Sequence, residues 1–503
     1  YYVKANEDIS LDIYEGETLG IVGESGCGKS TLGRVLLQLY EQTAGTTMYY
    51  GMSRAELAPR YVTDTLRHAK RYISKLHAAQ ARADAASAKV SQLGEAATFF
   101  DLQNKNLAVA EYQTAQAHIA KILGGFLVRD TEQGAALLYR KARLEERAAA
   151  LSDRIRDIEL MLDEAEGGTS DDGKPANASQ LARLKGRCDR LTRERGGLNA
   201  QIREAEQSIA AIKQAHRDDQ EFQRYEAMLD DGIDLARLKY SEMRILRKDL
   251  QIIFQDPYSS LNPRFTIGQI IEEGLVTHKF FRHGSPKMRE HVVRTMKECG
   301  LQEYMLFRYP HQFSGGQRQR ISIARALAVH PKFVVCDECV SALDVSIQSQ
   351  IINLLQELKQ KEHLTYMFIS HDLSVVRYIS DRICVMYLGN VVELADAATV
   401  FGDPRHPYTV ALLSSIPTTD MESLKKERIL LEGSIPSPVK PPDGCKFHTR
   451  CWMACDKCRR VPPPLAEIEP GHFVACHFPE RKLDENGNYL FEMPKTEKKS
   501  AKE

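Results

Sequence analysis

The feature that most constrains the fold is a glycine-rich stretch at residues 23–31, which follows a short apolar run. Residues 18–22 predict a strand and residues 31–40 predict a helix. Glycines between a strand and a helix allow backbone N–H groups to curl around an anion at the helix N-terminus. The stretch has the pattern of a phosphate-binding loop, and its members are Gly23, Glu24, Ser25, Gly26, Cys27, Gly28, Lys29, Ser30 and Thr31. We expect Lys29 to neutralise phosphate oxygens and the Ser30 hydroxyl to bind Mg²⁺, whereas a chance glycine-rich turn is the plainer alternative.

Composition divides the 503 residues into five ranges. Residues 1–51 and 243–400 alternate β-branched runs with helical patterns, which indicates an α/β fold around a mostly parallel sheet. Residues 52–242 are almost free of proline and rich in helix formers, so they predict a helical insertion. Residues 401–480 are rich in Pro and Cys and predict sparse regular structure, and residues 481–503 predict a disordered tail. Lys+Arg and Asp+Glu both number 68, so no overall basic charge points to nucleic acid.

Two apolar seams within the insertion predict a coiled-coil hairpin. Each seam advances by alternating steps of three and four residues. A stretch rich in helix breakers at residues 167–175 separates the seams, so the two helices are expected to run antiparallel. Arg195 fills the one polar position of the second seam. The seams consist of Leu144, Ala148, Leu151, Ile155, Ile158 and Leu162, and of Leu181, Leu184, Cys188, Leu191, Leu198, Ile202, Ala205, Ile209 and Ile212.

An acidic pair follows a second apolar run at residues 333–336. Asp337 is placed to orient the shell of a Mg²⁺ ion, and Glu338 is placed to polarise an attacking water. Taken alone, such a pair is more often an ordinary strand end. Four further groups change that weighting, and they are Gln255, Ser314-Gly315-Gly316-Gln317, Ser341-Ala342-Leu343-Asp344 and Ser370-His371-Asp372.

Together these groups resemble the ATPase subunits of ABC transporters, with Walker A, Q-loop, signature, Walker B, D-loop and H-loop motifs in order. The resemblance covers residues 1–51 and 243 to about 480 and leaves out the insertion. It implies ATP and Mg²⁺ as ligands, an ABC-type nucleotide-binding domain as the fold, and ATP hydrolysis as the activity. The implied metal ligands are Ser30, Gln255 and Asp337, and the implied catalytic residues are Glu338 as base, His371 at the γ-phosphate and Gln255.

The resemblance implies a different location for the signature group, Ser314 to Gln317. Small residues before a helix at 317–329 form a second anion-binding nest. The resemblance implies that Ser314, Gly315, Gly316 and Gln317 face ATP held by a second, homologous ATPase, so that two such domains close on ATP and open after hydrolysis. It also implies an aromatic residue close to thirty positions before Lys29. Counting back reaches the chain start, so Tyr2 is the candidate for stacking on adenine, with Tyr1 or an upstream residue as alternatives.

Longer stretches resemble the oligopeptide and dipeptide importer subfamily. They are residues 256–264, 311–313, 406–409 with Leu412 and Leu413, and 433–438. The resemblance implies peptide import driven by ATP. The implied partners are a second ATPase subunit, as a heterodimer, two transmembrane permease subunits and an extracellular substrate-binding protein. The implied location is peripheral, on the cytoplasmic face of the membrane, with membrane contact through the permease and no nucleic-acid partner.

The C-terminal cysteines match the Cys-bearing tail of peptide-importer ATPases. Four thiolates can hold an iron–sulfur cluster or tetrahedral zinc. The predicted ligands of a [4Fe-4S] cluster, with Zn²⁺ as the alternative, are Cys445, Cys451, Cys458 and Cys476. Cys455 could replace one of these four, and His448 and His477 are further alternatives. Cys336 and Cys384 lie in apolar runs and are expected in the core.

A helical hairpin within an ATPase also suggests a different class of protein, a chromosome-maintenance or DNA-repair ATPase with coiled-coil arms. In those proteins the arms separate the Q-loop from the signature. Here Gln255 and Ser314 are only 314 − 255 = 59 residues apart, and the insertion comes before both. The spacing therefore favours the transporter. The hairpin is expected to bind a protein partner or its own complex, or to be an inert elaboration.

Overall fold

The computed structural model describes residues 3–166, 178–281, 284–416, 429, 431 and 433–479. Contacts within the chain form two compact units, here called the sheet unit (Tyr1–Tyr40 and Ile245–Glu503) and the helical unit (Glu41–Arg244). The breaker-rich stretch at 167–175, the predicted tail at 481–503 and the two N-terminal tyrosines lie outside the described residues.

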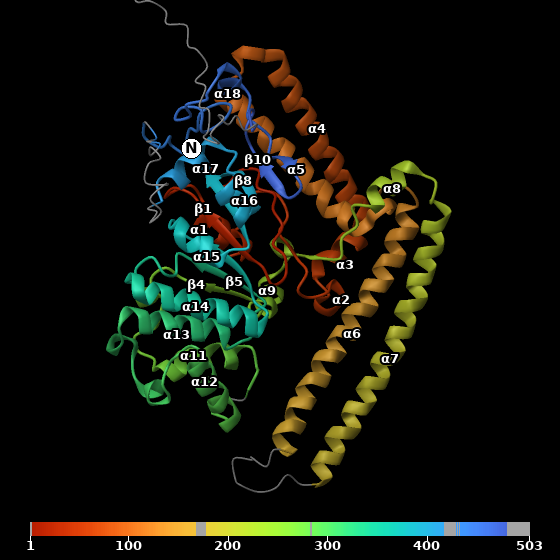
Figure 1. Cartoon of the computed structure of the whole chain (residues 1–503). Coiled ribbons are helices and arrows are strands. Elements are labelled where there is room, and N and C mark those ends of the chain that lie inside the picture. Colours follow the sequence, from red (N-terminus) through yellow and green to blue (C-terminus); the bar gives the residue numbers. More distant parts are fainter. Residues whose placement is uncertain are drawn as a thin grey trace, which may run out of the picture. The chain divides into compact units, whose positions relative to one another are not determined.

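The sheet unit is organised by an eight-stranded sheet with the order β4, β5, β6, β1, β7, β8, β10, β9 in the part of the chain that is described (Figure 1). Strands β4 to β7 are joined by parallel pairing, and β7, β8, β10 and β9 by antiparallel pairing. All residues of β1 and β6 are buried, as expected for unbroken apolar strands covered on both faces. The strands are β1 (Thr18–Val22), β4 (Leu250–Ile253), β5 (Phe333–Asp337), β6 (Thr365–Ile369), β7 (Arg382–Tyr387), β8 (Asn390–Asp396), β9 (Ala466–Glu469) and β10 (His472–Val474).

Most helices of this unit share one apolar core with the strands. Cys336 lies in this core, and Cys384 of β7 is also fully buried, which confirms the predicted burial of both. The helices are α1 (Lys29–Leu36), α10 (Pro257–Ser260), α11 (Ile267–Thr277), α12 (Pro286–Glu298), α13 (Gly315–Leu327), α14 (Val345–Glu362), α15 (Leu373–Ile379), α16 (Ala397–Gly402), α17 (Pro407–Ser414) and α18 (Asp456–Arg460), with short 3₁₀ helices at Glu303–Phe307 and Pro310–Gln312.

The Pro- and Cys-rich region contributes more regular structure than its composition predicts. It supplies α17, α18 and the last two strands of the main sheet. The reason is tertiary: β8 offers an unpaired edge, and β10 pairs with it in antiparallel register. Glu393 of β8 is fully buried and accepts hydrogen bonds from the backbone N–H groups of Arg405 (2.8 Å) and His406 (3.0 Å) and contacts His472 Nε2 (2.8 Å). Short-range composition cannot reveal such a partner.

The helical unit contains two long helical hairpins and a two-stranded ribbon. One hairpin pairs α4 with α5 and was not anticipated from the sequence; the other pairs α6 with α7. The ribbon pairs β2 with β3 antiparallel. The elements are β2 (Met48–Tyr49), α2 (Arg54–Leu57), α3 (Arg60–Arg67), α4 (Ala69–Leu93), α5 (Phe99–Leu123), α6 (Thr131–Glu166), α7 (Ala178–Ala215), α8 (Gln220–Glu226), β3 (Ile233–Asp234) and, at the boundary between the units, α9 (Tyr240–Leu246), with 3₁₀ helices at Gly94–Ala96, Gly124–Leu127 and Leu235–Arg237.

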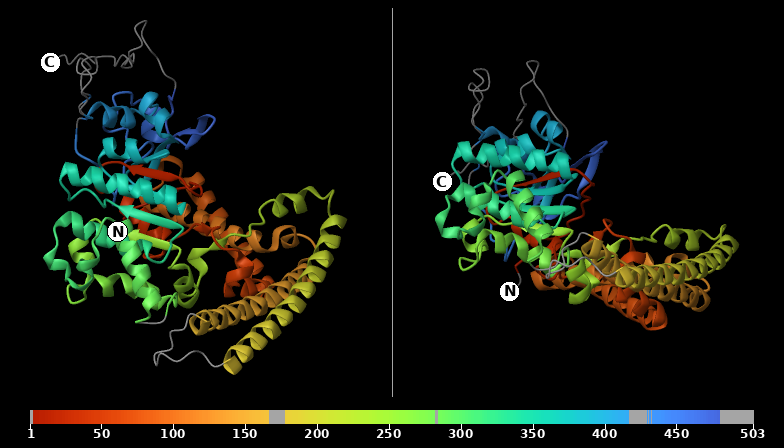
Figure 2. Two further views of the ribbon diagram at one scale, coloured as in Figure 1. Left: turned by 60° about the horizontal axis from the view of Figure 1, so that its bottom comes forward. Right: turned by 90° about the horizontal axis from the view of Figure 1, so that it is seen from below.

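Helices α6 and α7 lie side by side in both views of Figure 2. Lys141 pairs with Glu206 at 2.9 Å, whereas Arg195 donates to Ser152 Oγ at 3.3 Å. Because residue numbers rise along one helix as they fall along the other, the helices run antiparallel. Seam residues from both helices form a buried cluster, with Leu144, Leu151, Ile155, Ile158, Leu191 and Leu198 at its centre.

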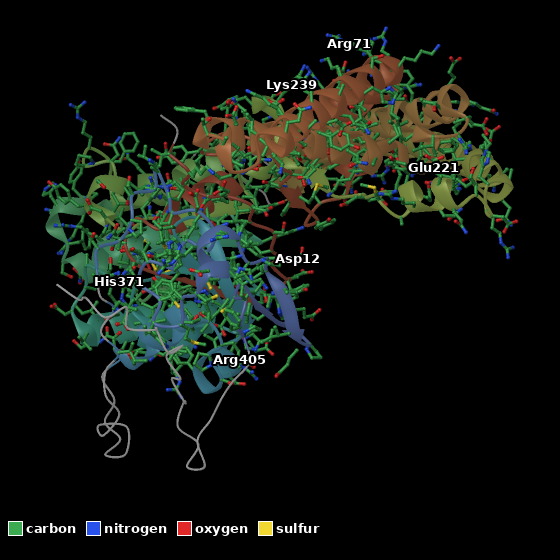
Figure 3. All side chains as sticks on the ribbon, turned by 90° about the horizontal axis from the view of Figure 1, so that it is seen from above. Asp12, Arg71, Glu221, Lys239, His371 and Arg405 are labelled. Carbon is green, nitrogen blue, oxygen red and sulfur yellow. The ribbon has the colours of Figure 1, made fainter. Side chains whose placement is uncertain are left out.

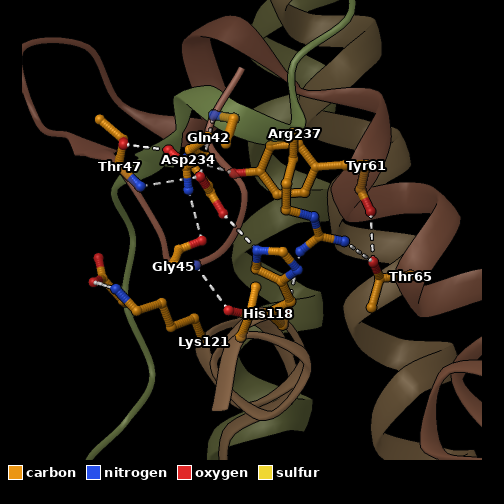
Figure 4. A network of polar contacts seen from close by, with 12 residues as sticks. Gln42, Gly45, Thr47, Tyr61, Thr65, His118, Lys121, Asp234 and Arg237 are labelled. Carbon is orange, nitrogen blue, oxygen red and sulfur yellow. Dashed lines mark hydrogen bonds and ion pairs between the residues drawn. The ribbon is translucent and has the colours of Figure 1, made fainter. Parts of the chain in front are cut away.

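A polar network fixes the ribbon to the helices of the same unit (Figure 4). Buried Asp234 Oδ2 lies 3.2 Å from His118 Nε2, and the Asp234 backbone N–H donates to the Tyr61 hydroxyl at 3.0 Å. Arg237 donates to Thr65 Oγ1 at 2.8 Å and stacks on the Tyr61 ring at 4.4 Å. The ribbon therefore belongs with the helices, and the compact helical unit begins near residue 41, about ten residues before the boundary expected from composition.

No helix in the described part of the chain is long and apolar enough to cross a membrane.

Candidate nucleotide site

The phosphate loop connects β1 to α1 and has a tightly confined backbone. Helix α1 begins at Lys29, two residues earlier than predicted. Gly28 has φ +102°, and a Cβ there would lie 2.2 Å from the carbonyl oxygen of Ala5. At Gly23, φ is +151° and a Cβ would lie 2.2 Å from the carbonyl oxygen of Met386. These positions require glycine because other residues would meet both backbone strain and a clash.

The ammonium group of Lys29 lies inside this loop. Its side chain is buried, and Nζ donates to the carbonyl oxygens of Gly23 (2.7 Å) and Glu24 (3.0 Å). The loop backbone therefore surrounds the Lys29 ammonium group at the N-terminus of α1. This arrangement favours the binding of an anion.

Ser30 and Asp337 meet across the sheet at the carboxyl ends of the parallel strands. Ser30 Oγ donates to Asp337 Oδ1 at 2.5 Å, and Arg34 Nη2 lies 3.4 Å from Asp337 Oδ2. Strand β6 separates β1 from β5, so it is α1 that brings the two side chains together. A Cβ at Gly33 would lie 2.9 Å from Val335 Cγ1, which shows how closely α1 approaches β5. A hydroxyl and a carboxylate in contact are oxygen ligands of the kind that Mg²⁺ uses.

The side chains of the three predicted catalytic residues, Gln255, Glu338 and His371, lie close together. Gln255 Nε2 donates to Glu338 Oε2 at 3.0 Å, and His371 Nδ1 lies 3.4 Å from the same oxygen. The backbone of Glu338 is held at φ +49°, and its N–H donates to the carbonyl oxygen of Ile369 at 3.0 Å. Residues that are 83 and 33 positions away in the chain thus converge on one carboxylate oxygen, which is what a positioned base requires.

The signature residues form a separate group at the start of α13. Ser314 caps this helix: its Oγ accepts from the Gln317 N–H at 3.4 Å, and its own N–H donates to Gln317 Oε1 at 3.2 Å. Gly316 is confined, because a Cβ there would lie 2.5 Å from Ile347 Cγ2. Ser314 and Gly315 are exposed. Among the hydrogen bonds of the described residues, none joins this group to the phosphate loop.

Glu24 has partners that sequence reasoning missed. Its carboxylate is held by both terminal nitrogens of Arg450, at 2.7 and 3.0 Å, and its backbone N–H donates to the Tyr408 hydroxyl at 2.8 Å. These two residues are about 400 positions away in the chain. The sequence places Arg450 directly before Cys451, a predicted metal ligand. That position does not indicate that Arg450 pairs with Glu24.

The C-terminal cysteines lie near one another without forming a finished metal site. Burial, together with a smaller contribution from neighbouring thiols, raises the pKa of Cys451 to about 12 and of Cys476 to about 11. Burial also raises the pKa of Cys445 and Cys458. Cys455 Sγ lies 3.7 Å from Cys458 Sγ. Within the described residues, no three His, Cys, Asp or Glu side chains converge so that they could hold a metal ion.

The two alternative histidine ligands are engaged elsewhere. His448 Nδ1 contacts the carbonyl oxygen of Cys445 at 2.8 Å, and His477 Nε2 contacts the carbonyl oxygen of Val461 at 2.8 Å.

Sequence comparisons agree with this geometry. Residues 6–127 and 222–341 match the ABC transporter family, and residues 392–458 match the C-terminal region of oligopeptide/dipeptide transporters. The chain is 53% identical over 248 residues to YkfD of Bacillus subtilis and 52% identical over 250 residues to the oligopeptide transport ATP-binding protein AppF of the same organism. Each match covers 49% of this chain and 75% of the relative.

Among solved structures, the dimeric structure of a bacterial ABC transporter cassette is 28% identical, with a TM-score of 0.30, covering 33% of this chain and 71% of that one.

A large α/β sheet with a phosphate loop at its centre and an acidic pair on a nearby strand defines an ABC-type ATPase. The chain belongs to the family of ATP-binding proteins of oligopeptide and dipeptide ABC transporters.

Proposed function

We propose that this protein hydrolyses ATP to drive the import of oligopeptides or dipeptides by an ABC transporter. The observation that carries the proposal is the convergence of Gln255 and His371 on Glu338 Oε2, directly after the strand whose last residue, Asp337, contacts Ser30. The names of the relatives support the transport of peptides.

The chemistry follows from these contacts. ATP with Mg²⁺ supplies the phosphoanhydride bond that is cleaved. Lys29 Nζ exchanges its two carbonyl partners for phosphate oxygens, and Ser30 Oγ, Asp337 and Gln255 would hold a Mg²⁺ ion. Glu338 Oε2 accepts a proton from the attacking water, and His371 contacts the γ-phosphate. Gly23, Ser25 to Gly28 and Thr31 bind phosphate through their backbone, whereas the Glu24 N–H is held by the Tyr408 hydroxyl. Tyr2 is proposed to stack on adenine, with Tyr1 or an upstream residue as alternatives.

The signature group completes the site of another subunit. Ser314, Gly315, Gly316 and Gln317 are placed to bind the γ-phosphate of ATP on a second, homologous ATPase, and the exposure of Ser314 and Gly315 supports this role. The pair of ATPases, a heterodimer, works with two permease subunits and an extracellular binding protein. The protein is then peripheral on the cytoplasmic face of the membrane, and nucleic acid is not a partner. Identifying the polypeptides that co-purify in detergent tests this assembly, because chromosomal proteins in place of permease subunits would contradict it.

The domain organisation belongs to the same proposal. By sequence, the nucleotide-binding domain consists of residues 1–51 and 243–400, the insertion of residues 52–242, the Cys-rich region of residues 401–480 and the tail of residues 481–503. Residues 41–51 of the first part pack with the helical unit. The insertion carries an antiparallel coiled coil, α6 with α7, that binds a protein of the same transporter complex. The family match leaves out residues 128–221, which contain α6 and α7, and this gap supports a separate origin for that hairpin. Cross-links from α6 or α7 to a co-purified subunit would support this role, and their absence would favour an inert elaboration.

Cys445, Cys451, Cys458 and Cys476 are proposed to hold a [4Fe-4S] cluster, with Zn²⁺ as the alternative. Support comes from proximity: the charges of Cys445 and Cys458 act on both Cys451 and Cys476, and that of Cys458 acts on Cys445. Cys455, whose Sγ lies 3.7 Å from Cys458 Sγ, could replace one of the four. Thiolates that are costly to form in a buried place are stabilised by a metal. A visible absorption spectrum of anaerobically prepared protein, with metal analysis, separates a cluster from zinc and from free thiols.

The decisive test of the ATPase site is Glu338→Gln, which keeps the size of the side chain and removes the base. ATP binding should persist while turnover falls by about 100-fold or more. Glu357→Gln, at an exposed position of α14, is the matched control and should hydrolyse ATP like the unaltered protein. Retained hydrolysis in Glu338→Gln would remove Glu338 from the role of base.

A further inference from the structure

Two side chains of the C-terminal region bind Glu24, the first residue of the phosphate loop that is not glycine. Arg450 holds the Glu24 carboxylate through two hydrogen bonds, and Tyr408 accepts the Glu24 backbone N–H. The Arg450 side chain is only 7% exposed and that of Glu24 is 23% exposed. A bidentate pair with so little access to solvent is a strong and directional contact.

Arg450 is itself held in place by a buried aromatic cluster. Its backbone N–H donates to the carbonyl oxygen of Phe447 at 3.0 Å. The buried Phe447 ring lies 5.2 Å from the Tyr387 ring and 5.4 Å from the Tyr408 ring. The residues that hold Glu24 therefore share one packed cluster, and Tyr387 at the end of β7 connects that cluster to the sheet.

A second set of contacts joins the same C-terminal turn to the loop. Lys446 Nζ donates to the carbonyl oxygen of Leu388 at 2.9 Å, and the next residue, Gly389, donates its N–H to the carbonyl oxygen of Cys27 at 2.9 Å. The turn between β7 and β8 is thus bonded to the C-terminal segment on one side and to the phosphate loop on the other. The loop is supported at both Glu24 and Cys27.

The negative charge of Glu24 makes its contact with Arg450 important for ligand binding. Glu24 adds a negative charge to a loop that must accept a polyanion, and an unpaired carboxylate there would repel the phosphates. Arg450 compensates that charge. Tyr408 fixes the direction of the Glu24 peptide before any ligand arrives, so the loop need not be ordered on binding.

We propose that Arg450 and Tyr408 act as positioning residues for the phosphate loop, so that the affinity of this chain for MgATP depends on its C-terminal region. This inference rests on the proposed role of the loop as the ATP site. Neither residue takes part in bond cleavage; both act through Glu24. The prediction is therefore a change in nucleotide affinity and KM with little change in kcat, because Gln255, Glu338 and His371 are not in contact with this pair.

The test compares the full-length protein with Arg450→Gln and Arg450→Lys, by titration with a fluorescent ATP analogue in the presence of Mg²⁺ and by steady-state ATP hydrolysis. Arg450→Gln should bind about tenfold more weakly, with kcat changed by less than about twofold. Arg450→Lys, which keeps the charge and loses the bidentate geometry, should fall between the two. Unchanged affinity in Arg450→Gln would overturn the inference.

The matched control is Arg405→Gln. Arg405 is also mostly buried and pairs with Glu469 at 2.9 Å and Asp403 at 2.7 Å in the same unit, but it has no contact with the loop. Figure 3 shows it well apart from His371. This variant should lose thermal stability without losing affinity for MgATP. Equal loss of affinity in both arginine variants would mean that Arg450 is merely structural, and would overturn the proposal.

A double-mutant cycle separates action through Glu24 from any other effect. In the Arg450→Gln background, Glu24→Gln removes the uncompensated carboxylate, so it should restore much of the lost affinity. Additive losses would overturn the proposal. If Arg450→Gln does not fold, Tyr408→Phe still tests it, because this variant keeps the buried ring and should weaken binding by about threefold through the lost acceptor. Wild-type protein that binds no MgATP would instead overturn the proposed function itself.

Discussion

Lowering the pH from 8 to 5 should destabilise the sheet unit through His406, at the start of α17. This side chain is 1% exposed, and its backbone N–H donates to Glu393 Oε2. Its Nδ1 accepts the Tyr408 N–H at 3.1 Å, so the neutral ring is the form that caps the helix. Burial lowers the pKa of His406 from 6.5 to about 4, while the negative charge of Glu393 opposes that change.

The sign and size follow from linkage. Because the folded-state pKa is depressed, the unfolded chain binds a proton below pH 6.5 that the folded chain refuses. The stabilisation is therefore fully present above pH 6.5 and is lost as the pH falls toward 4. Each pH unit in that window costs about 1.4 kcal/mol, so the loss is about 2 kcal/mol at pH 5 and about 3 kcal/mol below pH 4.

Urea unfolding of wild type and His406→Asn at pH 8 and pH 5 measures this loss. The single tryptophan, Trp452, lies in the same C-terminal region and reports its unfolding by fluorescence. Asparagine keeps an acceptor for the Tyr408 N–H but does not titrate. The stability difference between the two proteins should change by about 2 kcal/mol between the two pH values. Parallel pH profiles would show that His406 does not carry the dependence, and would refute the reasoning.

Two further predictions concern the loop and the helical unit. Gly28→Ala should cost about 1 to 3 kcal/mol and prevent the rise in melting temperature that MgATP gives to the wild type, because the new Cβ meets the carbonyl oxygen of Ala5 at φ +102°. A normal MgATP response would contradict this. In the α6 and α7 pair, Ile155→Ala should lower the free energy of unfolding by about 2 to 5 kcal/mol, whereas Gly186→Ala, where an added Cβ meets open space, should raise it by about 0.5 to 1 kcal/mol. Denaturant unfolding followed by circular dichroism distinguishes the two, and effects of the same sign would be the contrary result.

The secondary structure around the site was largely predictable. Strands β1 and β5 begin and end near the expected residues, because their runs of buried apolar residues are unbroken. Helix starts were less accurate: α1 begins at Lys29 and α13 at Gly315, each two residues before the expected start. The first turn of α1 contains Ser30 and Thr31, and α13 opens with Gly315 and Gly316. These residue types have low helix propensity, so the loop before each helix decides where it begins.

What the sequence determined by itself is the chemistry: the glycines and lysine of a phosphate loop, the acidic pair and the ordered motifs whose residues converge on Glu338. These are local signals, because a loop or a strand end consists of consecutive residues. Only the tertiary structure decided that the ribbon of residues 48–49 belongs with the helices, that a Cys-rich region extends the main sheet, and that Arg450 meets Glu24. Such contacts join segments hundreds of residues apart, and the free energy that selects them comes from burial and charge pairing that no single segment contains.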